Sequence, residues 1–100
     1  MQKINAKEYM RDKCFEFRDK SRANEDETSQ QELLVAASIS LVFESLAELV
    51  NDDAYLSRHQ QSHLTDLIKL LVGLRPEPQV LTEAQAIGIF QMATYVNTCK

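Results

Sequence analysis

The chain has few of the residues that build turns and sheets. Its 100 residues include two glycines, two prolines and no tryptophan. A sheet protein needs turn-forming residues at regular intervals, and they are missing here. Leucine, alanine, glutamate and glutamine, which favour helices, are abundant. The length suits one domain. We therefore expect residues 1–100 to form a single all-α domain, a small four-helix bundle-like domain with a central apolar second helix.

Cysteine is also scarce, with only Cys14 and Cys99 present. The first ten residues, MQKINAKEYM, lack the apolar segment of a secretory signal peptide. Two cysteines without such a signal indicate free thiols in a reducing compartment, so we expect a cytoplasmic protein. In an up-and-down bundle the two cysteines would be offset by about 13 Å, at about 1.5 Å per residue. That offset disfavours a disulfide, and a redox role for either thiol stays open.

The motifs of catalysis and metal binding are missing as well. Gly73 and Gly88 are too far apart to form a phosphate-binding loop, and no serine or cysteine nucleophile lies in a recognisable motif. His59 and His63 have the i, i+4 spacing of zinc ligands on a helix, but Gln60 stands where a zinc protease requires glutamate. Solvent-exposed histidines are the commoner case. We expect no catalytic activity, no cofactor and no bound metal.

Charge is distributed unevenly along the chain, which has a net charge of −4. Basic side chains outnumber acidic ones in residues 1–22, whereas residues 23–53 carry acidic side chains only. An acidic chain is a poor match for nucleic acid, whose binding depends on neutralising phosphates with lysine and arginine. The composition disfavours a nucleic-acid partner. The alternative of a nucleic-acid-associated regulator that uses the basic first helix stays open.

Capping signals place the first two helices. Asn5 with Glu8 three residues later has the spacing of a capping box and predicts a helix that runs to about Arg22. Ser29 predicts the start of a second helix, which ends near residues 51–53.

The third and fourth helices follow from the same signals. The third has two alternative starts, near Asp53 or at Ser57, and we expect it to end at Gly73 in a left-handed conformation. Residues 75–80, RPEPQV, form an extended linker because proline disfavours helix in the preceding residue. Thr82 then predicts the start of a fourth helix that runs to the C-terminus.

The stretch 33–50, LLVAASISLVFESLAELV, is almost entirely apolar, but two glutamates interrupt it and exclude a membrane span. On a helical wheel Ser40 and Glu44 lie opposite a broad apolar face, and Leu34 and Leu41 form a second apolar stripe. A helix with two apolar stripes needs neighbours on two sides, so we expect it at the centre of the fold. The broad face comprises Val35, Ile39, Val42, Phe43, Leu46, Leu49 and Val50.

The fourth helix has no Asp, Glu, Lys, Arg or His between Ala84 and Cys99. An uncharged face with small residues suits close packing against another helix, for example from a second subunit, although exposed Gln and Thr would give the same pattern. The first helix could instead cover the second stripe and leave a monomer. The predicted apolar inner face is Ala86, Ile89, Phe90, Ala93 and Val96. The predicted self-association residues of a homodimer are Leu34, Leu41, Met92 and Tyr95.

One aromatic residue, Phe15, falls on the polar side of the first helix. An exposed aromatic among arginines has the composition of an interface hot spot, although Phe15 could also pack on a neighbouring loop. We expect a small non-catalytic protein–protein interaction module that acts as an adaptor, a regulator or an inhibitor of another protein, whose identity the sequence does not give. The small size of the chain suits a bacterial or phage accessory protein. The predicted partner-binding residues are Arg11, Phe15, Arg18 and Arg22.

Overall fold

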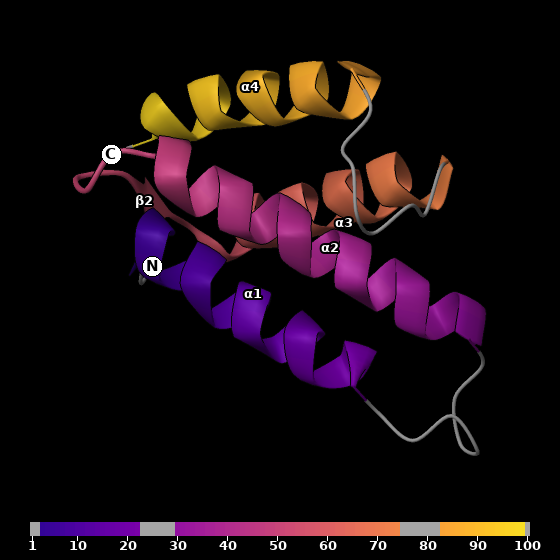
Figure 1. Cartoon of the computed structure of the whole chain (residues 1–100). Helices are drawn as coiled ribbons and strands as arrows, with labels where there is room; N and C mark the ends of the chain where they lie inside the picture. The colour runs from indigo at the N-terminus through magenta and orange to yellow at the C-terminus, as the bar shows by residue number, and fades with distance from the viewer. Residues whose placement is uncertain (1–2, 23–29, 75–82, 100) are drawn as a thin grey trace.

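A computed structural model describes residues 3–22, 30–74 and 83–99 (Figure 1). Within these ranges it contains four helices and one small two-stranded sheet, so the predicted all-α fold is confirmed. The elements in chain order are β1 (Ile4–Asn5), α1 (Ala6–Ser21), α2 (Gln30–Leu49), β2 (Tyr55–Leu56), α3 (Arg58–Leu74) and α4 (Glu83–Asn97).

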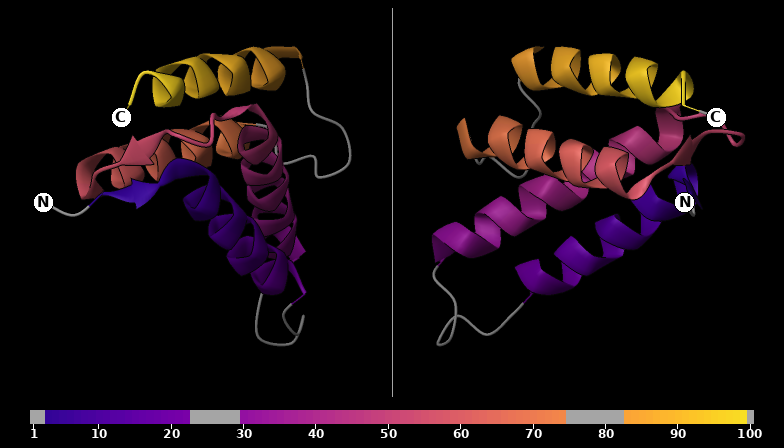
Figure 2. Two further views of the ribbon diagram at one scale, coloured as in Figure 1. Left: turned by 90° about the vertical axis from the view of Figure 1, so that its left-hand side faces the viewer. Right: turned by 180° about the vertical axis from the view of Figure 1, so that it is seen from behind.

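The second helix occupies the centre, as predicted from its two apolar stripes. Helix α2 contacts α1, α3 and α4. In Figure 1, α1 lies on one side of α2 and α4 on the other. Figure 2 shows that α3 and α4 run alongside each other and that the α1–α2 pair is inclined to them. The long apolar run is therefore stable in water because three helices surround it.

The core is built around the broad face of α2. Val42, Phe43 and Leu46 have no solvent-accessible side-chain surface. The Phe43 ring packs edge-on against Tyr9 at 6.2 Å between centroids and stacks with Phe17 at 5.9 Å. Burial of each such side chain contributes about 1.5–3 kcal/mol. Other helices complete this core with the fully buried side chains Met10, Leu64, Ile68, Val72 and Val96.

The wheel is wrong at Ser40, which was expected on the outer side of α2 and is buried. Its hydroxyl donates a hydrogen bond to the carbonyl oxygen of Cys14 at 2.8 Å, across the α1–α2 contact. A small side chain allows close packing of the two helices, and the hydrogen bond compensates for the loss of water. Close approach of α1 thus extends the buried surface of α2 beyond its apolar stripes.

The helix starts agree with the capping signals where the structure describes them. The Asn5 side chain accepts a hydrogen bond from the Glu8 N–H at 3.1 Å. At α3, the Gln60 N–H donates to the Ser57 hydroxyl at 3.3 Å, and the Ser57 N–H donates to the Gln60 side chain at 2.8 Å. This reciprocal capping box confirms the start after Ser57 and shows that the alternative start near Asp53 is wrong.

A short sheet pairs the residues before α1 with the segment between α2 and α3, and the sequence did not predict it. Strands β1 and β2 are antiparallel, with Ile4 opposite Leu56. Next to this pair, the Ala6 N–H donates to the Ala54 carbonyl at 2.8 Å, and the Tyr55 N–H donates to the Cys99 carbonyl at 3.1 Å. The sheet therefore joins the beginning of α1, the α2–α3 connection and the end of α4.

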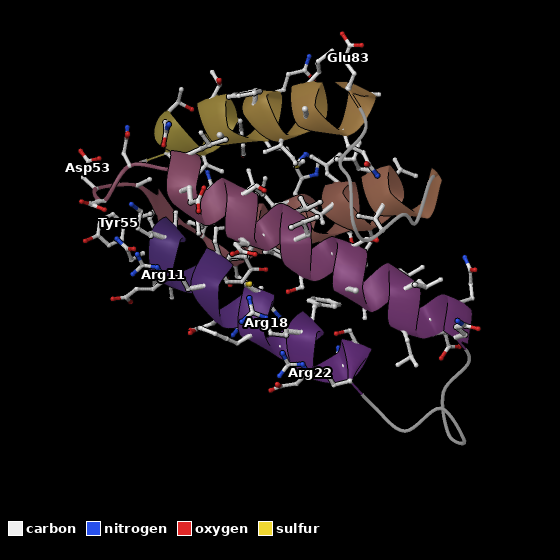
Figure 3. The ribbon with its side chains drawn as sticks, viewed as in Figure 1. Arg11, Arg18, Arg22, Asp53, Tyr55 and Glu83 are labelled. Atoms are coloured by element: carbon white, nitrogen blue, oxygen red, sulfur yellow. The ribbon has the colours of Figure 1, made fainter. Side chains whose placement is uncertain are left out.

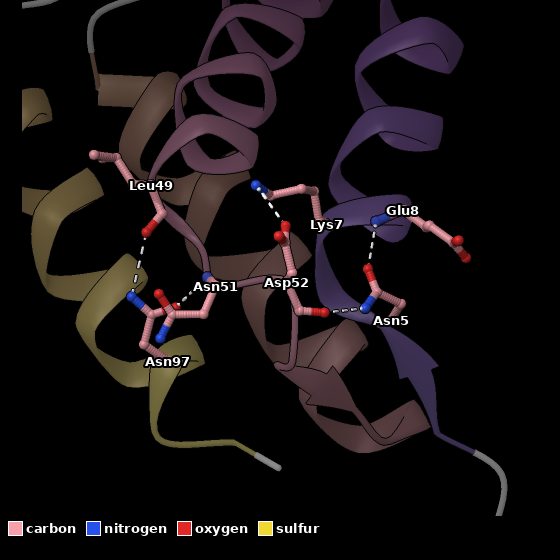
Figure 4. A network of polar contacts seen from close by, with 7 residues as sticks. All are labelled: Asn5, Lys7, Glu8, Leu49, Asn51, Asp52 and Asn97. Atoms are coloured by element: carbon pink, nitrogen blue, oxygen red, sulfur yellow. Dashed lines mark hydrogen bonds and ion pairs between the residues drawn. The ribbon is translucent and has the colours of Figure 1, made fainter.

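A polar network reinforces the same end of the fold (Figure 4). The Asn97 amide donates to the Leu49 carbonyl at 3.2 Å, and its oxygen accepts from the Asn51 N–H at 2.7 Å. The Asn5 amide donates to the Asp52 carbonyl at 2.7 Å. Side chains from α4 and from the start of α1 thus satisfy backbone groups at the end of α2.

The end of α3 differs from the prediction. Gly73 lies inside the helix, and no glycine in the described ranges has a positive φ. The expected left-handed glycine is therefore wrong, because the helix continues through Gly73 to Leu74. The predicted cap at Ser29, the linker 75–80 and the predicted cap at Thr82 lie outside the described residues.

Candidate protein-interaction surfaces

The predicted partner-binding residues lie along one face of α1. Arg11, Phe15, Arg18 and Arg22 are spaced by four, three and four residues, which places them on one side of a helix. Figure 3 shows the three arginines following the length of α1. The Phe15 side chain is 58% exposed. We name these four residues the arginine stripe.

Within the arginine stripe, Arg18 is held beside Phe15. Its guanidinium carbon lies 5.5 Å from the centre of the Phe15 ring, a cation–π contact that contributes about 0.5–1 kcal/mol at an exposed site. Its Nη2 atom lies 3.9 Å from Glu44 Oε2 on α2 and donates to the Cys14 sulfur at 3.8 Å. Three neighbours therefore restrict Arg18 to an orientation beside the exposed aromatic ring.

One further pair of charges lies within α1. Lys13 Nζ lies 2.9 Å from Glu16 Oε2. The hydrogen bond from Lys13 lowers the pKa of Glu16, and the same bond raises the pKa of Lys13. Since both side chains are partly exposed to solvent, the pair contributes little to stability. It neutralises the charge of Lys13 beside the arginine stripe, and Lys7 is paired in the same way with Asp52 at 3.0 Å.

A groove of about 440 Å³ runs between α3 and α4. Leu64 and Met92 are buried beneath it, and Leu67 and Tyr95 are partly exposed along its edges. Gly88 also lines the groove and permits close approach of α4 to α3. The groove is lined mainly by apolar side chains and has the shape that suits an apolar helix side chain from another molecule.

The structure brings together only two of the predicted self-association residues. Met92 and Tyr95 both line the α3–α4 groove. Leu34 and Leu41 lie on α2, are half-buried and do not line this groove. The self-association surface predicted from the sequence therefore includes two residues of one groove and two residues outside it.

A second apolar surface lies on the outer face of α4. Phe90, expected on the inner face, is 61% exposed, and Ile87 is 52% exposed. Together with Gln91 and Thr94 they surround a shallow hollow. The inner face uses Met92 in place of Phe90, because α4 contacts α2 and α3 on the side of Ile89, Met92, Ala93 and Val96. We name Ile87, Phe90, Gln91 and Thr94 the outer face of α4.

This surface was missed from the sequence because Phe90 was placed on the inner face of the helix and Ile87 was assigned to neither face. The signal was present in the spacing. Ile87, Phe90 and Thr94 recur at intervals of three and four residues, which marks a continuous stripe distinct from that of Ile89 and Val96. Leu70 of α3, 66% exposed, was also not singled out from the sequence.

The candidate metal ligands are dispersed. His59 and His63 are exposed, and Cys14 and Cys99 are buried free thiols. The Cys99 sulfur accepts a hydrogen bond from the Gln60 side chain at 3.4 Å. Among the described residues, no three His, Cys, Asp or Glu side chains gather in a way that could hold a metal ion.

Comparison with protein-family models, curated proteins and solved structures gave no match. In the part of the chain that the structure describes, no helix combines the length and the apolarity needed to cross a membrane. The exposed side chains of α1, α3 and α4 are therefore the features from which a function can be inferred.

Proposed function

We propose that this chain is a non-catalytic protein–protein interaction module that binds its partner through the arginine stripe of α1. The observation that supports the proposal is the exposed Phe15 ring with the Arg18 guanidinium 5.5 Å from its centre. Arginine and aromatic residues are enriched among the residues that dominate binding energy at interfaces. Such a module acts as an adaptor, a regulator or an inhibitor of the protein it contacts.

The arrangement also defines the chemistry of the partner. Phe15 requires an apolar pocket. The three arginines lie on one side of Phe15, and exposed Asp12 and Asp19 lie on the other, so the partner needs carboxylates only along the edge of the pocket that faces the arginines. Arg18 is already held by Glu44 and by the Phe15 ring, which lowers the entropy lost when it contacts a partner. The proposed partner surface is an apolar pocket with carboxylates along the edge that faces the arginines.

The alternative of nucleic-acid binding has weaker support. Exposed Asp12 and Asp19 lie on α1 among the basic residues, and a phosphate backbone would be repelled by both. Glu44 further reduces the positive potential beside Arg18. Protein contact through Phe15 uses an apolar side chain that phosphate binding would leave unused.

The proposal can be tested by affinity capture from the native host with the full chain as bait. Phe15→Ala removes the central ring, and Tyr55→Ala is the control because it removes an exposed aromatic ring from β2. We expect a partner that is captured by the wild type and by Tyr55→Ala and is lost with Phe15→Ala. In solution, the affinity for that partner should fall by more than about tenfold with Phe15→Ala, the loss typical of a hot-spot residue.

Two results would contradict the proposal. One is a partner that binds Phe15→Ala and the wild type equally well. The other is capture of nucleic acid whose affinity falls steeply and linearly on a log–log plot against salt concentration, which would favour the nucleic-acid alternative. Circular dichroism of each variant shows whether the fold is retained.

A further inference from the structure

The geometry points to a second copy of this chain as the occupant of the outer face of α4, in an antiparallel two-fold dimer. This inference concerns a different helix from the arginine stripe and is independent of it. Three features of the outer face support a dimer: the spacing of its side chains, its lack of charged residues and its position in the middle of α4.

The shape of the outer face is that of a helix–helix contact. Ile87, Phe90, Gln91 and Thr94 stand at positions i, i+3, i+4 and i+7 and surround the hollow. Four residues of one helix form such a hole in packed helix pairs, and one side chain of the facing helix fills it. The same face presents Phe90 and Ile87, both more than half exposed, as side chains that can fill a hole. The outer face of α4 thus supplies both the hole and the side chains that can fill the same hole on a second copy.

The charge of α4 suits contact with an identical copy. A two-fold interface places residues near the axis opposite the same residues of the other copy, so any charge near the axis meets its like. Residues 84–99 contain no Asp, Glu, Lys, Arg or His. A face without charge avoids this repulsion and offers no electrostatic selection for a different partner.

The position of the outer face on α4 allows the α4 helices of two copies to overlap over most of their length. Phe90 is the middle residue of α4, which runs from Glu83 to Asn97. An antiparallel pair centred between Phe90 and Gln91 overlaps along the entire helix and places Ile87 of one copy near Thr94 of the other. The α3–α4 groove adjoins this face through Gln91, which lines both. The exposed Leu70 on the far side of the groove extends the apolar surface.

Sedimentation equilibrium over a range of micromolar concentrations tests the dimer. We expect the wild type to approach twice the monomer mass of 11.4 kDa as its concentration rises. Phe90→Glu places like charges across the axis and should weaken the dimer by more than about tenfold. Phe15→Glu is the matched control, since Phe15 is equally exposed on α1, and it should leave the dimer intact.

A mixing experiment tests the two-fold symmetry. Phe90→Glu and Phe90→Lys should each be monomeric alone, and an equal mixture should form a dimer because opposite charges then meet across the axis. Thr94→Glu provides a second disruptive variant at a polar, exposed position, in case a substitution at Phe90 alters the fold. Circular dichroism checks that each variant is folded.

Several outcomes would overturn the inference. A single 11.4 kDa species at every concentration would leave the outer face to a different protein. A dimer that persists in folded Phe90→Glu and Thr94→Glu, or that dissociates with Phe15→Glu, would place the interface elsewhere. A mixture of folded Phe90→Glu and Phe90→Lys chains that stays monomeric would exclude the antiparallel contact through Phe90.

Discussion

A Cβ atom on Gly88 would lie 3.2 Å from Cδ1 and 3.3 Å from Cδ2 of Leu71. The backbone of α4 therefore packs directly against a leucine side chain of α3. Since Gly88 and Leu71 both line the groove between these helices, a side chain at position 88 would press on Leu71 at the wall of the groove.

Gly88→Val is expected to lower the free energy of unfolding by about 1–3 kcal/mol, because added methyl groups would overpack the contact with Leu71. Gly73→Val is the matched control. A Cβ at Gly73 meets nothing within 4 Å, and this glycine has no left-handed backbone. Chemical denaturation of both variants measures the difference. Equal effects of the two substitutions would show that Leu71 does not limit the approach of α4.

Leu46→Ala is expected to lower the free energy of unfolding by about 2–5 kcal/mol, since it leaves a cavity at a fully buried position in the last turn of α2. Leu70→Ala, the same substitution at a 66% exposed position, should change it by less than about 0.5 kcal/mol. Urea or guanidinium melts give both values. A cost below about 0.5 kcal/mol for Leu46→Ala would mean that α2 is not the core helix.

The features that the sequence predicted correctly depend on local interactions. The helix starts at Asn5 and Ser57 depend on side chains that reach backbone groups three residues away, so spacing alone identifies them. The central position of α2 followed from its two apolar stripes. The exposure of Phe15 followed from its position among charged residues on α1.

The features that the sequence could not provide depend on tertiary neighbours. Ser40 is buried because α1 approaches that side of α2, and a wheel of α2 contains no information about α1. Phe90 is exposed because the contacts of α4 with α2 and α3 use the adjacent stripe. The strand pairing of Ile4 with Leu56 joins residues far apart in the chain. Two-residue strands carry too few residues for a period-2 pattern to be recognised.

The pKa of Glu16 is expected to lie below the ordinary glutamate value of 4.5 because Lys13 donates a hydrogen bond to its carboxylate. A lowered pKa in the folded state means that the pair stabilises the fold above about pH 4.5 and that this contribution disappears as the pH falls through the lowered value. NMR titration of the carboxyl carbon should show that Lys13→Met moves the pKa of Glu16 upward.

Lys20→Met is the matched control for this titration, because Lys20 acts on Glu16 only through its charge and more weakly than Lys13 does. It should move the pKa of Glu16 by a smaller amount. High salt should also reduce the shift, since both members of the Lys13–Glu16 pair are exposed enough to be screened. A pKa for Glu16 that is the same in Lys13→Met and in the wild type would contradict the ion pair.

Asn97→Ala is expected to lower the free energy of unfolding by about 0.5–1.5 kcal/mol, the net value of a hydrogen bond that water can partly replace. The substitution removes the donor to the Leu49 carbonyl and the acceptor for the Asn51 N–H, and so frees the end of α2 from α4. Thr94→Ala is the control, since the Thr94 hydroxyl bonds only to the Phe90 carbonyl of its own helix. Thermal or denaturant melts of both variants measure the two losses.

The substitution Asn97→Asp distinguishes the contributions of the two hydrogen bonds that the Asn97 side chain makes. An aspartate keeps the acceptor for the Asn51 N–H but loses the donor, and its negative charge would face the Leu49 carbonyl and the end of α4. Protonation restores an O–H donor, so the folded state should raise the pKa of this carboxyl. The stabilising contribution of the protonated form is then present below the unfolded pKa and is lost as the pH rises through the folded value. The stability difference between wild type and Asn97→Asp should therefore be larger at pH 7 than at pH 3, and a difference independent of pH would show that the contact with Leu49 contributes nothing.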